Sequence, residues 1–341
     1  MNSVTLEVIV TGYRRFPCAL YRACMAMPKI LDDALDALVV PGFSRIGYLV
    51  RAGQFAPLDH NALTGKTIVI TGPTSGLGQA AAHQLAAMGA DLILVGRSAE
   101  KLERTMGELV RDSESQKFHT VIADMGDLDA VRSASQQILN LTSSLHALIH
   151  NAGALLKTRD VSPQGFETTI ATHVLGPHQM STTLLPLLKT SAGRVITVSS
   201  GGMYAASLPN VAVDESPEMT PAYYDGTRQY AIAKRIQVTL NEMWAIREPQ
   251  VFFSAMHPGW ADTPGVQESL PAFRLLTKPL LRSAEQGADT ICWLASRSIA
   301  DDSGKFWSDR AVRSIHRLPR TRTSDTPEVR EALWQWCNQR I

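Results

Sequence analysis

The sequence predicts an α/β fold, a doubly wound parallel sheet in a single domain preceded by a helical N-terminal extension. Two observations lead to this prediction. From residue 66 onward, short continuous apolar runs alternate with longer segments of helical periodicity, and the first apolar run leads directly into a glycine-rich turn. Continuous apolar runs are typical of strands buried on both faces, as in a parallel sheet covered by helices.

The strands are predicted at 67–71, 92–95, 120–123, 147–150, 195–198 and 251–256. Helical patterns lie at 79–88, 99–112, 127–140, 163–189 and 226–247, and a short helix is predicted near 328–338. Right-handed crossovers between these strands give a Rossmann-type sheet. We expect the sheet domain to span residues 61–310, with 1–60 as the extension and 311–341 as a C-terminal tail.

The composition is that of an ordinary globular protein. Of 341 residues, 19% are charged and 45% are hydrophobic, and the formal net charge of +1 predicts no strong attraction to nucleic acid or anionic membrane. Cys18, Cys24, Cys292 and Cys337 form no C-x-x-C pair, so we expect neither a metal site nor a disulfide framework. With no apolar run of about 18 residues and no secretory signal, the predicted location is cytoplasmic.

The N-terminal extension mixes apolar residues with Arg14, Arg15, Arg22 and Lys29, a pattern that predicts one or two amphipathic helices. Our interpretation is an element packed on the sheet domain or on a second subunit. The alternative is a helix on a membrane surface, which would give residues 1–50 a peripheral membrane contact. The acidic residues of the segment weaken that alternative, because they leave it with hardly any net positive charge.

The glycine-rich turn is Thr71-Gly-Pro-Thr-Ser-Gly-Leu-Gly78, between a predicted strand and a predicted helix. Glycines let such a turn approach a pyrophosphate closely and expose backbone N–H groups at the helix N-terminus. This indicates a dinucleotide site. The residues predicted to contact the cofactor here are Gly72, Thr74, Ser75, Gly76, Leu77 and Gly78.

The second predicted strand ends in Val95-Gly96-Arg97-Ser98. Enzymes that use NAD usually place an acid here for the ribose 2′-hydroxyl, whereas an arginine accommodates a 2′-phosphate. Gly96 leaves the acidic position empty, so Arg97 favours NADP(H) as the cofactor; the alternative is a solvated arginine. Asp124 ends the third strand, where it could face the adenine, and Asn151-Ala152-Gly153 ends the fourth.

The segment Tyr230-Ala-Ile-Ala-Lys234 places a phenol and an amine four residues apart on a predicted helix, so both can point into one site. A free phenol has a pKa of about 10, and a neighbouring cation lowers it by favouring the phenolate. Downstream of the glycine-rich turn and of Val198-Ser-Ser200, this pair indicates an oxidoreductase.

In these motifs, residues from about 66 to 310 resemble the short-chain dehydrogenase/reductase superfamily. The shared motifs are the glycine-rich turn, Asn151-Ala-Gly153, Val198-Ser-Ser200, Tyr230-x-x-x-Lys234 and His257-Pro-Gly259. The runs 194–203, 256–266 and 285–289 are more specific and resemble the dehydrogenase/reductase member 12 group.

The resemblance implies a role for each site residue. Tyr230 would be the general acid/base, and Lys234 would lower its pKa and bind the nicotinamide ribose. Ser200, with Ser199 as the fallback, would hydrogen-bond the substrate oxygen. Asn151 and Thr263, together with the pair Pro258-Gly259, would contact the cofactor.

One departure from the family pattern concerns His173, which stands where relatives supply an asparagine that holds a proton-relay water. An imidazole could bridge the same water, could titrate itself, or could break the relay. We therefore include His173 among the candidate catalytic residues.

Two further segments are interpreted as follows. The apolar helical pattern at 264–283 predicts a mobile lid over an apolar substrate, with ordinary packing as the alternative. Five arginines near the C-terminus are interpreted as a solvated or subunit-facing strip: Arg310, Arg313, Arg317, Arg320 and Arg322.

The expected function is an NADP(H)-dependent oxidoreductase that acts on the carbonyl or alcohol of an apolar small molecule, with no nucleic-acid partner. By resemblance, the helices at 163–189 and 226–247 suggest a homodimer or homotetramer. One alternative is a nucleotide-binding regulatory or scaffold protein with weakened turnover. Another is a sugar-nucleotide epimerase or dehydratase, which the form of the glycine-rich turn disfavours.

Overall fold

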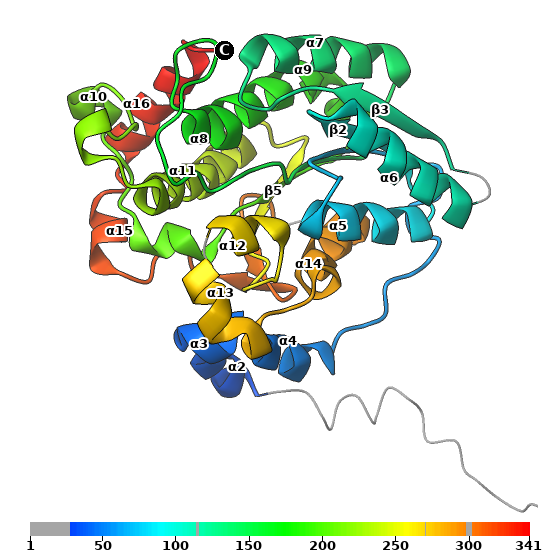
Figure 1. The fold of residues 1–341 in the computed structure, drawn as a ribbon, viewed down its shortest axis with the longest axis horizontal. Coiled ribbons are helices and arrows are strands. Elements are labelled where there is room, and N and C mark those ends of the chain that lie inside the picture. The colour runs from blue at the N-terminus through cyan, green and yellow to red at the C-terminus, as the bar shows by residue number, and fades with distance from the viewer. Residues whose placement is uncertain (1–27, 114–115, 270, 298–301) are drawn as a thin grey trace, which may run out of the picture.

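The computed structural model describes residues 28–113, 116–269, 271–297 and 302–341. Within these residues the strands form one eight-stranded sheet in the order β3-β2-β1-β4-β5-β6-β7-β8, with helices on both faces (Figure 1). All neighbouring pairs are parallel except β7 and β8, which are antiparallel. The predicted Rossmann-type doubly wound sheet is confirmed.

The strands are β1 (Thr67–Thr71), β2 (Asp91–Gly96), β3 (Phe118–Ile122), β4 (Ala147–His150), β5 (Arg194–Val198), β6 (Phe252–Met256), β7 (Phe306–Ser308) and β8 (Ala311–Arg313). The first six overlap the predicted apolar runs. The hairpin of β7 and β8 was not predicted, because each strand has three residues and neither is a continuous apolar run. Because of this hairpin the sheet continues beyond residue 310, to Arg313.

Two large apolar clusters lie on opposite faces of the sheet. One cluster combines α5 (Gly76–Ala87), α6 (Ala99–Asp112) and α14 (Ala284–Ser296) with strand residues such as Ile68 and Ile70. The other combines α7 (Leu128–Leu141), α9 (Gly176–Thr190) and α11 (Gly226–Arg247) with residues such as Val69. Since successive strand residues point to opposite faces, one continuous apolar strand supplies both cores.

Short polar side chains fix where several of these helices begin. Ser98 accepts a hydrogen bond from the N–H of Lys101 at the start of α6, and Asp225 does so from Arg228 at the start of α11. Ser283 and Gln286 form a complete capping box at α14. Such caps satisfy N–H groups that the helix itself leaves unpaired, and they explain why α6 and α11 have their predicted bounds.

The described part of the N-terminal extension is helical, as predicted, and comprises α2 (Lys29–Ala37), α3 (Val39–Phe43) and α4 (Arg45–Ala52). It packs on the sheet domain next to α12 (Pro264–Ser269) and α13 (Pro271–Thr277) (Figure 1). Its other face leaves large apolar side chains exposed: Ile30, Leu31, Leu38, Val39, Val40, Ile46, Leu49 and Val50. Residues 1–27, including Cys18 and Cys24, lie outside the described residues.

The interpretation of the C-terminal arginines as a solvated or subunit-facing strip is wrong for Arg310, Arg313 and Arg317. Arg310 pairs with Asp289 at 2.5 Å. Arg313 pairs with Asp32 and Arg317 with Asp36, both at 2.8 Å. The reason is that α2, almost 300 residues away in sequence, carries the two partner carboxylates.

The C-terminal helix α16 (Pro327–Asn338) covers the ends of α9 and α11. The Asn338 side-chain oxygen lies 2.9 Å from His178 Nε2, and the rings of Trp334 and Trp244 are in edge contact with centroids 4.9 Å apart. The loop between Ser200 and Tyr230 packs beside it, since the Trp336 indole donates to the Glu215 carbonyl oxygen at 3.0 Å. No helix in the described residues is both long and apolar enough to cross a bilayer.

Candidate active site

The glycine-rich turn joins β1 to α5 through left-handed backbone. Gly72 has φ +66° and Gly76 has φ +53°, conformations that glycine adopts without strain. Gly78 has a steric reason, because a Cβ there would lie 2.1 Å from the Gly72 carbonyl oxygen. Ser75, at the N-cap of α5, makes no side-chain cap hydrogen bond, so the first N–H groups of α5 remain able to bind an anion.

Asn151 holds this turn in place from the neighbouring strand. Its amide Nδ2 donates to the carbonyl oxygens of Thr71 at 3.0 Å and Gly72 at 3.1 Å. In return, Thr71 Oγ1 accepts from the backbone N–H groups of Asn151 and Ala152. The Asn151 amide therefore binds backbone carbonyl oxygens of the turn, and in this way it fixes the shape of the turn that lines the cavity.

A cavity of about 360 Å³ opens above this turn, at the carboxyl ends of β1, β2 and β4. Many residues predicted to contact the cofactor line it: Gly72, Thr74, Ser75, Gly76, Leu77, Gly78, Arg97, Asp124, Asn151, Ala152, Gly153 and Thr263. Pro258 and Gly259 are not part of its lining. Sequence reasoning missed Ser98, Lys101, Met125, Thr168, Thr169 and Thr172, which also line it.

The missed residues come from helix starts beside the expected strand ends. Lys101 lies one turn into α6, so it faces the same part of the cavity as the exposed Arg97. Its spacing after the Arg97-Ser98 corner is the signal that could have revealed it. The threonines belong to α8 (Thr168–Ile170) and the π-helical turn η1 (Ala171–Leu175), which no sequence pattern distinguished from ordinary helix.

Tyr230 and Lys234 lie one turn apart on α11, as predicted, and Lys234 Nζ is 5.2 Å from the centroid of the Tyr230 ring. The Lys234 ammonium donates to the Val198 carbonyl oxygen at 2.9 Å, at the end of β5. Ser199 is buried, and its hydroxyl donates to the Lys234 carbonyl oxygen at 3.1 Å. Ser200 is therefore the serine of the pair that is free to face Tyr230.

Burial dominates the protonation of this group. It raises the pKa of Tyr230 to about 12, and a hydrogen bond with Ser200 acts in the opposite direction. Burial also lowers the pKa of Lys234 to about 7, so the amine is only partly charged near neutral pH. The lowering of the Tyr230 pKa that we expected from Lys234 is therefore not what this arrangement produces; at neutral pH the phenol keeps its proton.

His173 lies in η1, with its ring edge-on to Tyr230 and the two centroids 5.4 Å apart. Its Nε2 is 2.9 Å from the Ala154 carbonyl oxygen, so Nε2 carries the proton and Nδ1 is the acceptor. Burial and the nearby Lys234 hold the pKa of His173 well below its usual 6.5, so the ring stays neutral. A neutral ring favours a role as hydrogen-bond acceptor at Nδ1 over a role as a titrating group, and Nδ1 is buried without a partner among the described residues.

Gly153 lies between the cavity and the group formed by Ser200, Tyr230 and Lys234. A Cβ at Gly153 would lie 2.1 Å from His173 Cε1, so only glycine leaves room for the imidazole. Gly153 and Ala154 line the cavity, and His173 in turn contacts Tyr230. The cavity therefore ends one layer of side chains from the phenol, although Ser200, Tyr230 and Lys234 themselves are not among its lining residues.

The segment predicted to form a lid lies over the glycine-rich turn. Thr263 covers the glycine-rich turn, since a Cβ at Gly76 would be 3.2 Å from its side chain. The helical pattern resolves into the two short helices α12 and α13, and Ser269 Oγ donates to the Leu155 carbonyl oxygen across the cavity at 2.8 Å. Leu275 and Leu276 on α13 are 79% and 82% exposed, so they do not pack inward.

Comparison with known proteins agrees with this geometry. A family profile described as short chain dehydrogenase matches residues 66–211. The human protein named Dehydrogenase/reductase SDR family member 12 is 39% identical over 325 residues, which cover 94% of this chain and 98% of that protein. Human Retinol dehydrogenase 12 is 29% identical, and the match covers 80% of this chain and 85% of that protein.

Two solved structures share the fold. An alcohol dehydrogenase from the archaeon Thermococcus sibiricus complexed with 5-hydroxy-NADP has a TM-score of 0.54 and 23% identity, covering 68% of this chain and 91% of its own. A 3-ketoacyl-(acyl-carrier-protein) reductase from Brucella melitensis complexed with NADH has a TM-score of 0.57 and 22% identity, covering 71% and 96%.

The chain therefore belongs to the short-chain dehydrogenase/reductase family of oxidoreductases, with that family's NAD(P)-binding fold. Most of its length is similar to Dehydrogenase/reductase SDR family member 12, which confirms the resemblance predicted from the motifs. The residues present fit a dinucleotide: the left-handed glycines open the turn, the first N–H groups of α5 are uncapped, and two cationic side chains stand at the far end of the cavity.

Proposed function

We propose that this protein is an NADP(H)-dependent oxidoreductase that interconverts the carbonyl and alcohol forms of an apolar small molecule. The observation that supports this proposal best is the grouping of Ser200, Tyr230 and Lys234 one layer of side chains beyond the end of a cavity shaped for a dinucleotide. A nicotinamide cofactor, when bound, supplies or accepts the hydride.

The protein's own residues then handle the proton and the substrate oxygen. Because the Tyr230 hydroxyl carries its proton at neutral pH, it can donate that proton to a carbonyl oxygen as reduction proceeds. Ser200 donates a hydrogen bond to the same oxygen and stabilises its developing charge. Lys234 supports the group by fixing the end of β5 through Val198, and by family resemblance it would bind the nicotinamide ribose.

The preference for NADP(H) is supported by the corner after β2. Gly96 brings no carboxylate to the ribose position, while Arg97 and Lys101 both line the cavity there. Two cations can pair with a 2′-phosphate, and neither gains a comparable partner from a 2′-hydroxyl. This cofactor choice is part of the proposal.

An apolar substrate is supported by the relatives and by the lining of the cavity. Human Retinol dehydrogenase 12, by its name, acts on an apolar alcohol. Leu156 lines the cavity from the loop after β4. Apolar walls with a few polar groups at the reacting atoms are typical of sites for small apolar ligands.

The decisive experiment compares wild-type protein with Tyr230→Phe. We expect NADPH binding within about twofold of wild type, while turnover of apolar aldehydes and ketones falls by about a thousandfold or more, as for loss of a general acid. Binding by calorimetry and turnover by NADPH oxidation are the two measurements. Near-normal turnover in Tyr230→Phe would contradict the mechanism, and tight NADPH binding without turnover in the wild type would favour a regulatory role.

We also infer a peripheral contact with a lipid surface. Apolar side chains are exposed together on α2–α4 and α13, and clusters of this kind mark interaction surfaces. Flotation with phosphatidylcholine vesicles tests this contact. A variant with serine at Leu38, Val39 and Val40 should lose flotation, whereas a control with serine at the remote exposed residues Val110, Val213 and Ile246 should keep it; equal behaviour of the two variants would exclude this surface.

A further inference from the structure

The N-terminal extension touches both polypeptide ends of the lid. We define the lid segment as residues 260–269 and 271–282, which contains α12 and α13. At its first residue, the Trp260 N–H donates to the Phe43 carbonyl oxygen at 2.8 Å. At its last residue, Arg282 Nε donates to the Ser44 carbonyl oxygen at 3.2 Å and Arg282 Nη2 to that of Gly42 at 3.1 Å.

The two ends of the lid segment are also paired with each other. The Arg282 N–H donates to the Trp260 carbonyl oxygen at 2.7 Å, and the Asp262 N–H donates to that of Arg282 at 2.9 Å. These bonds make a short parallel bridge between Ala261 and Arg282. The lid segment is therefore a loop closed at its base, where Trp260 and Arg282 meet. Residues 42–44 of the extension accept hydrogen bonds from both of these residues.

The Phe43 side chain also contacts residues on either side of the lid base and next to Ser200. It is buried, with its ring centroid 4.2 Å from that of His257 and 6.2 Å from that of Trp260. On another side, a Cβ at Gly201 would lie 2.6 Å from Phe43 Cε2, so the ring rests against the residue that follows Ser200. The Phe43 ring thus contacts Trp260 at the base of the lid segment and Gly201, the neighbour of the proposed substrate-binding serine, Ser200.

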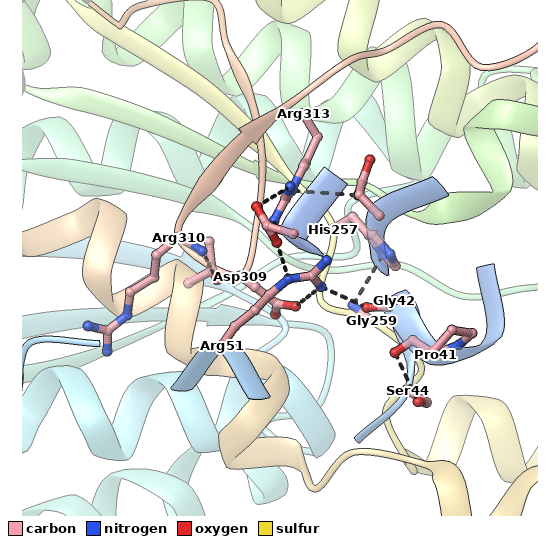
Figure 2. A network of polar contacts seen from close by, with 12 residues as sticks. Pro41, Gly42, Ser44, Arg51, His257, Gly259, Asp309, Arg310 and Arg313 are labelled. Atoms are coloured by element: carbon pink, nitrogen blue, oxygen red, sulfur yellow. Dashed lines mark hydrogen bonds and ion pairs between the residues drawn. The ribbon is translucent and has the colours of Figure 1, made fainter. Parts of the chain in front are cut away.

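A buried ionic cluster fixes residues 42–44 in turn. Asp309 accepts from Arg282 at 2.5 Å and from Arg51 at 2.7 Å, and Arg51 also donates to the Gly42 carbonyl oxygen at 3.0 Å. Figure 2 shows the Arg51 guanidinium between Asp309 and Gly42. Gly259, at φ +76°, lies against Arg282, where a Cβ would be 2.2 Å from Nε. All three charged side chains are nearly inaccessible to solvent.

We propose that residues 42–44, with Phe43 at their centre, are a positioning element that sets how the lid segment covers the substrate. Phe43 touches no reacting atom and is not part of the nucleotide cavity. It acts through Trp260 and Gly201, at the base of the lid segment and beside Ser200, and not through the part of the lid segment around Thr263 that lines the nucleotide cavity. This inference rests on the proposed function for its kinetic consequence, but not for its structural one.

The structural consequence is tested first, in protein without substrate. Amide hydrogen exchange of the lid base should accelerate by about tenfold or more in Phe43→Ala, because local opening follows the loss of local contacts. Exchange in the glycine-rich turn, residues 72–78, should not change. The matched control is Ile46→Ala, which removes an exposed apolar side chain of the same extension.

Two outcomes of the exchange experiment would overturn the proposal. Unchanged exchange at the lid base would show that residues 42–44 do not hold it. A uniform acceleration across the whole chain would make Phe43 a general stabilising residue. Neither outcome depends on catalytic activity, so a failure of the proposed function is distinguishable from a failure of this inference.

The kinetic consequence separates positioning from stability. With an apolar carbonyl substrate, Phe43→Ala should raise KM by about tenfold while kcat and the Kd for NADPH stay within about twofold, since binding is lost without loss of transition-state chemistry. Phe43→Leu should raise KM less than Phe43→Ala does. A variant that lowers the active fraction alone would change apparent kcat and leave KM unaltered, which would contradict the positioning role.

A double-mutant cycle with a residue outside the buried base tests whether Phe43 acts through Trp260. Phe273 on α13 packs edge-on against Trp260, with centroids 5.1 Å apart, and is only partly buried. If both phenylalanines act through Trp260, the effects of Phe43→Ala and Phe273→Ala on exchange at the lid base will be smaller together than their sum. Strict additivity would mean that the two rings act independently, and it would overturn the route through Trp260.

Discussion

The nucleotide side and the substrate side of this molecule are stabilised in different ways. On the nucleotide side, backbone atoms lie close together. The Asn151 side-chain amide donates to two carbonyl oxygens of the turn, and Gly78 allows the Gly72 carbonyl oxygen to approach. On the substrate side, the lid base depends on buried charges, with Asp309 between two guanidiniums. The first arrangement depends on a close approach of backbone atoms that glycine allows, and the second on the pairing of buried charges.

This difference determines what a substitution should do on each side. A Cβ added to close-packed main chain displaces the backbone locally, so binding suffers before stability does. Removing one member of a buried ionic cluster leaves an uncompensated charge in an apolar surrounding, which destabilises the whole protein. Burial alone would raise the pKa of Asp309, but Arg282 and Arg51 outweigh it and hold that pKa below its usual value.

The largest effect is expected for Asp309→Asn. It leaves the buried Arg282 without a carboxylate and Arg51 with Asp32 alone. Loss of one partner of such a cluster typically costs about 3–5 kcal/mol of unfolding free energy. Urea unfolding measures it. The control is Asp33→Asn, whose pair with Lys29 is 55% and 85% exposed, so its effect should be under about 0.5 kcal/mol. Equal midpoints for the two variants would remove the energetic distinction between the two sides.

A smaller effect, confined to nucleotide binding, is expected for Gly78→Ala. The added methyl would meet the Gly72 carbonyl oxygen at 2.1 Å and Asn151 Nδ2 at 2.4 Å. We expect about a hundredfold weaker NADPH binding, about 3 kcal/mol, measured by calorimetry. Gly107→Ala on α6 is the control, since nothing lies within 4 Å of its Cβ position. Undiminished affinity in Gly78→Ala would show that the turn relaxes without loss.

The smallest effect sharpens the comparison within the nucleotide side. Arg97→Ala should weaken NADPH binding by about tenfold, since an exposed charge-assisted contact contributes about 1–1.5 kcal/mol, and NADH binding should stay within about twofold. Arg104→Ala tests for a general charge effect, because Arg104 is exposed on α6 and does not line the cavity. Equal losses for NADPH and NADH would contradict the phosphate role.

The sequence predicted those parts of the fold that local patterns determine. The bounds of β1, β4, α6 and α11 agree with the predicted runs, because strand hydrophobicity and helix caps are read from neighbouring residues. The hairpin of β7 and β8 was missed, because its strands are too short to show a period. The arginine strip was misinterpreted for a related reason: an arginine and its carboxylate partner on another element leave no shared local pattern.

The candidate site divides in the same way. The glycine-rich turn and the Arg97 corner line the cavity as predicted, since each follows a strand end directly. What the sequence could not supply was the electrostatic environment. The spacing of Tyr230 and Lys234 predicted a lowered phenol pKa, but that spacing carries no information on burial, which raises the pKa of Tyr230 to about 12.

The pairing of Arg51 with Asp309 joins residues that are 258 positions apart in the chain. The helices α2–α4 are made before the sheet, yet the pair of Arg51 and Asp309 cannot form until the segment of β7 and β8 has been made. Contacts of such long sequence separation form late, because the loop-closure entropy must be overcome before they can stabilise anything. During synthesis, the side chains of the extension that later become buried, Phe43 and Arg51 among them, therefore remain uncovered until residue 309 has been made. Chaperone binding or aggregation would compete with folding at this stage.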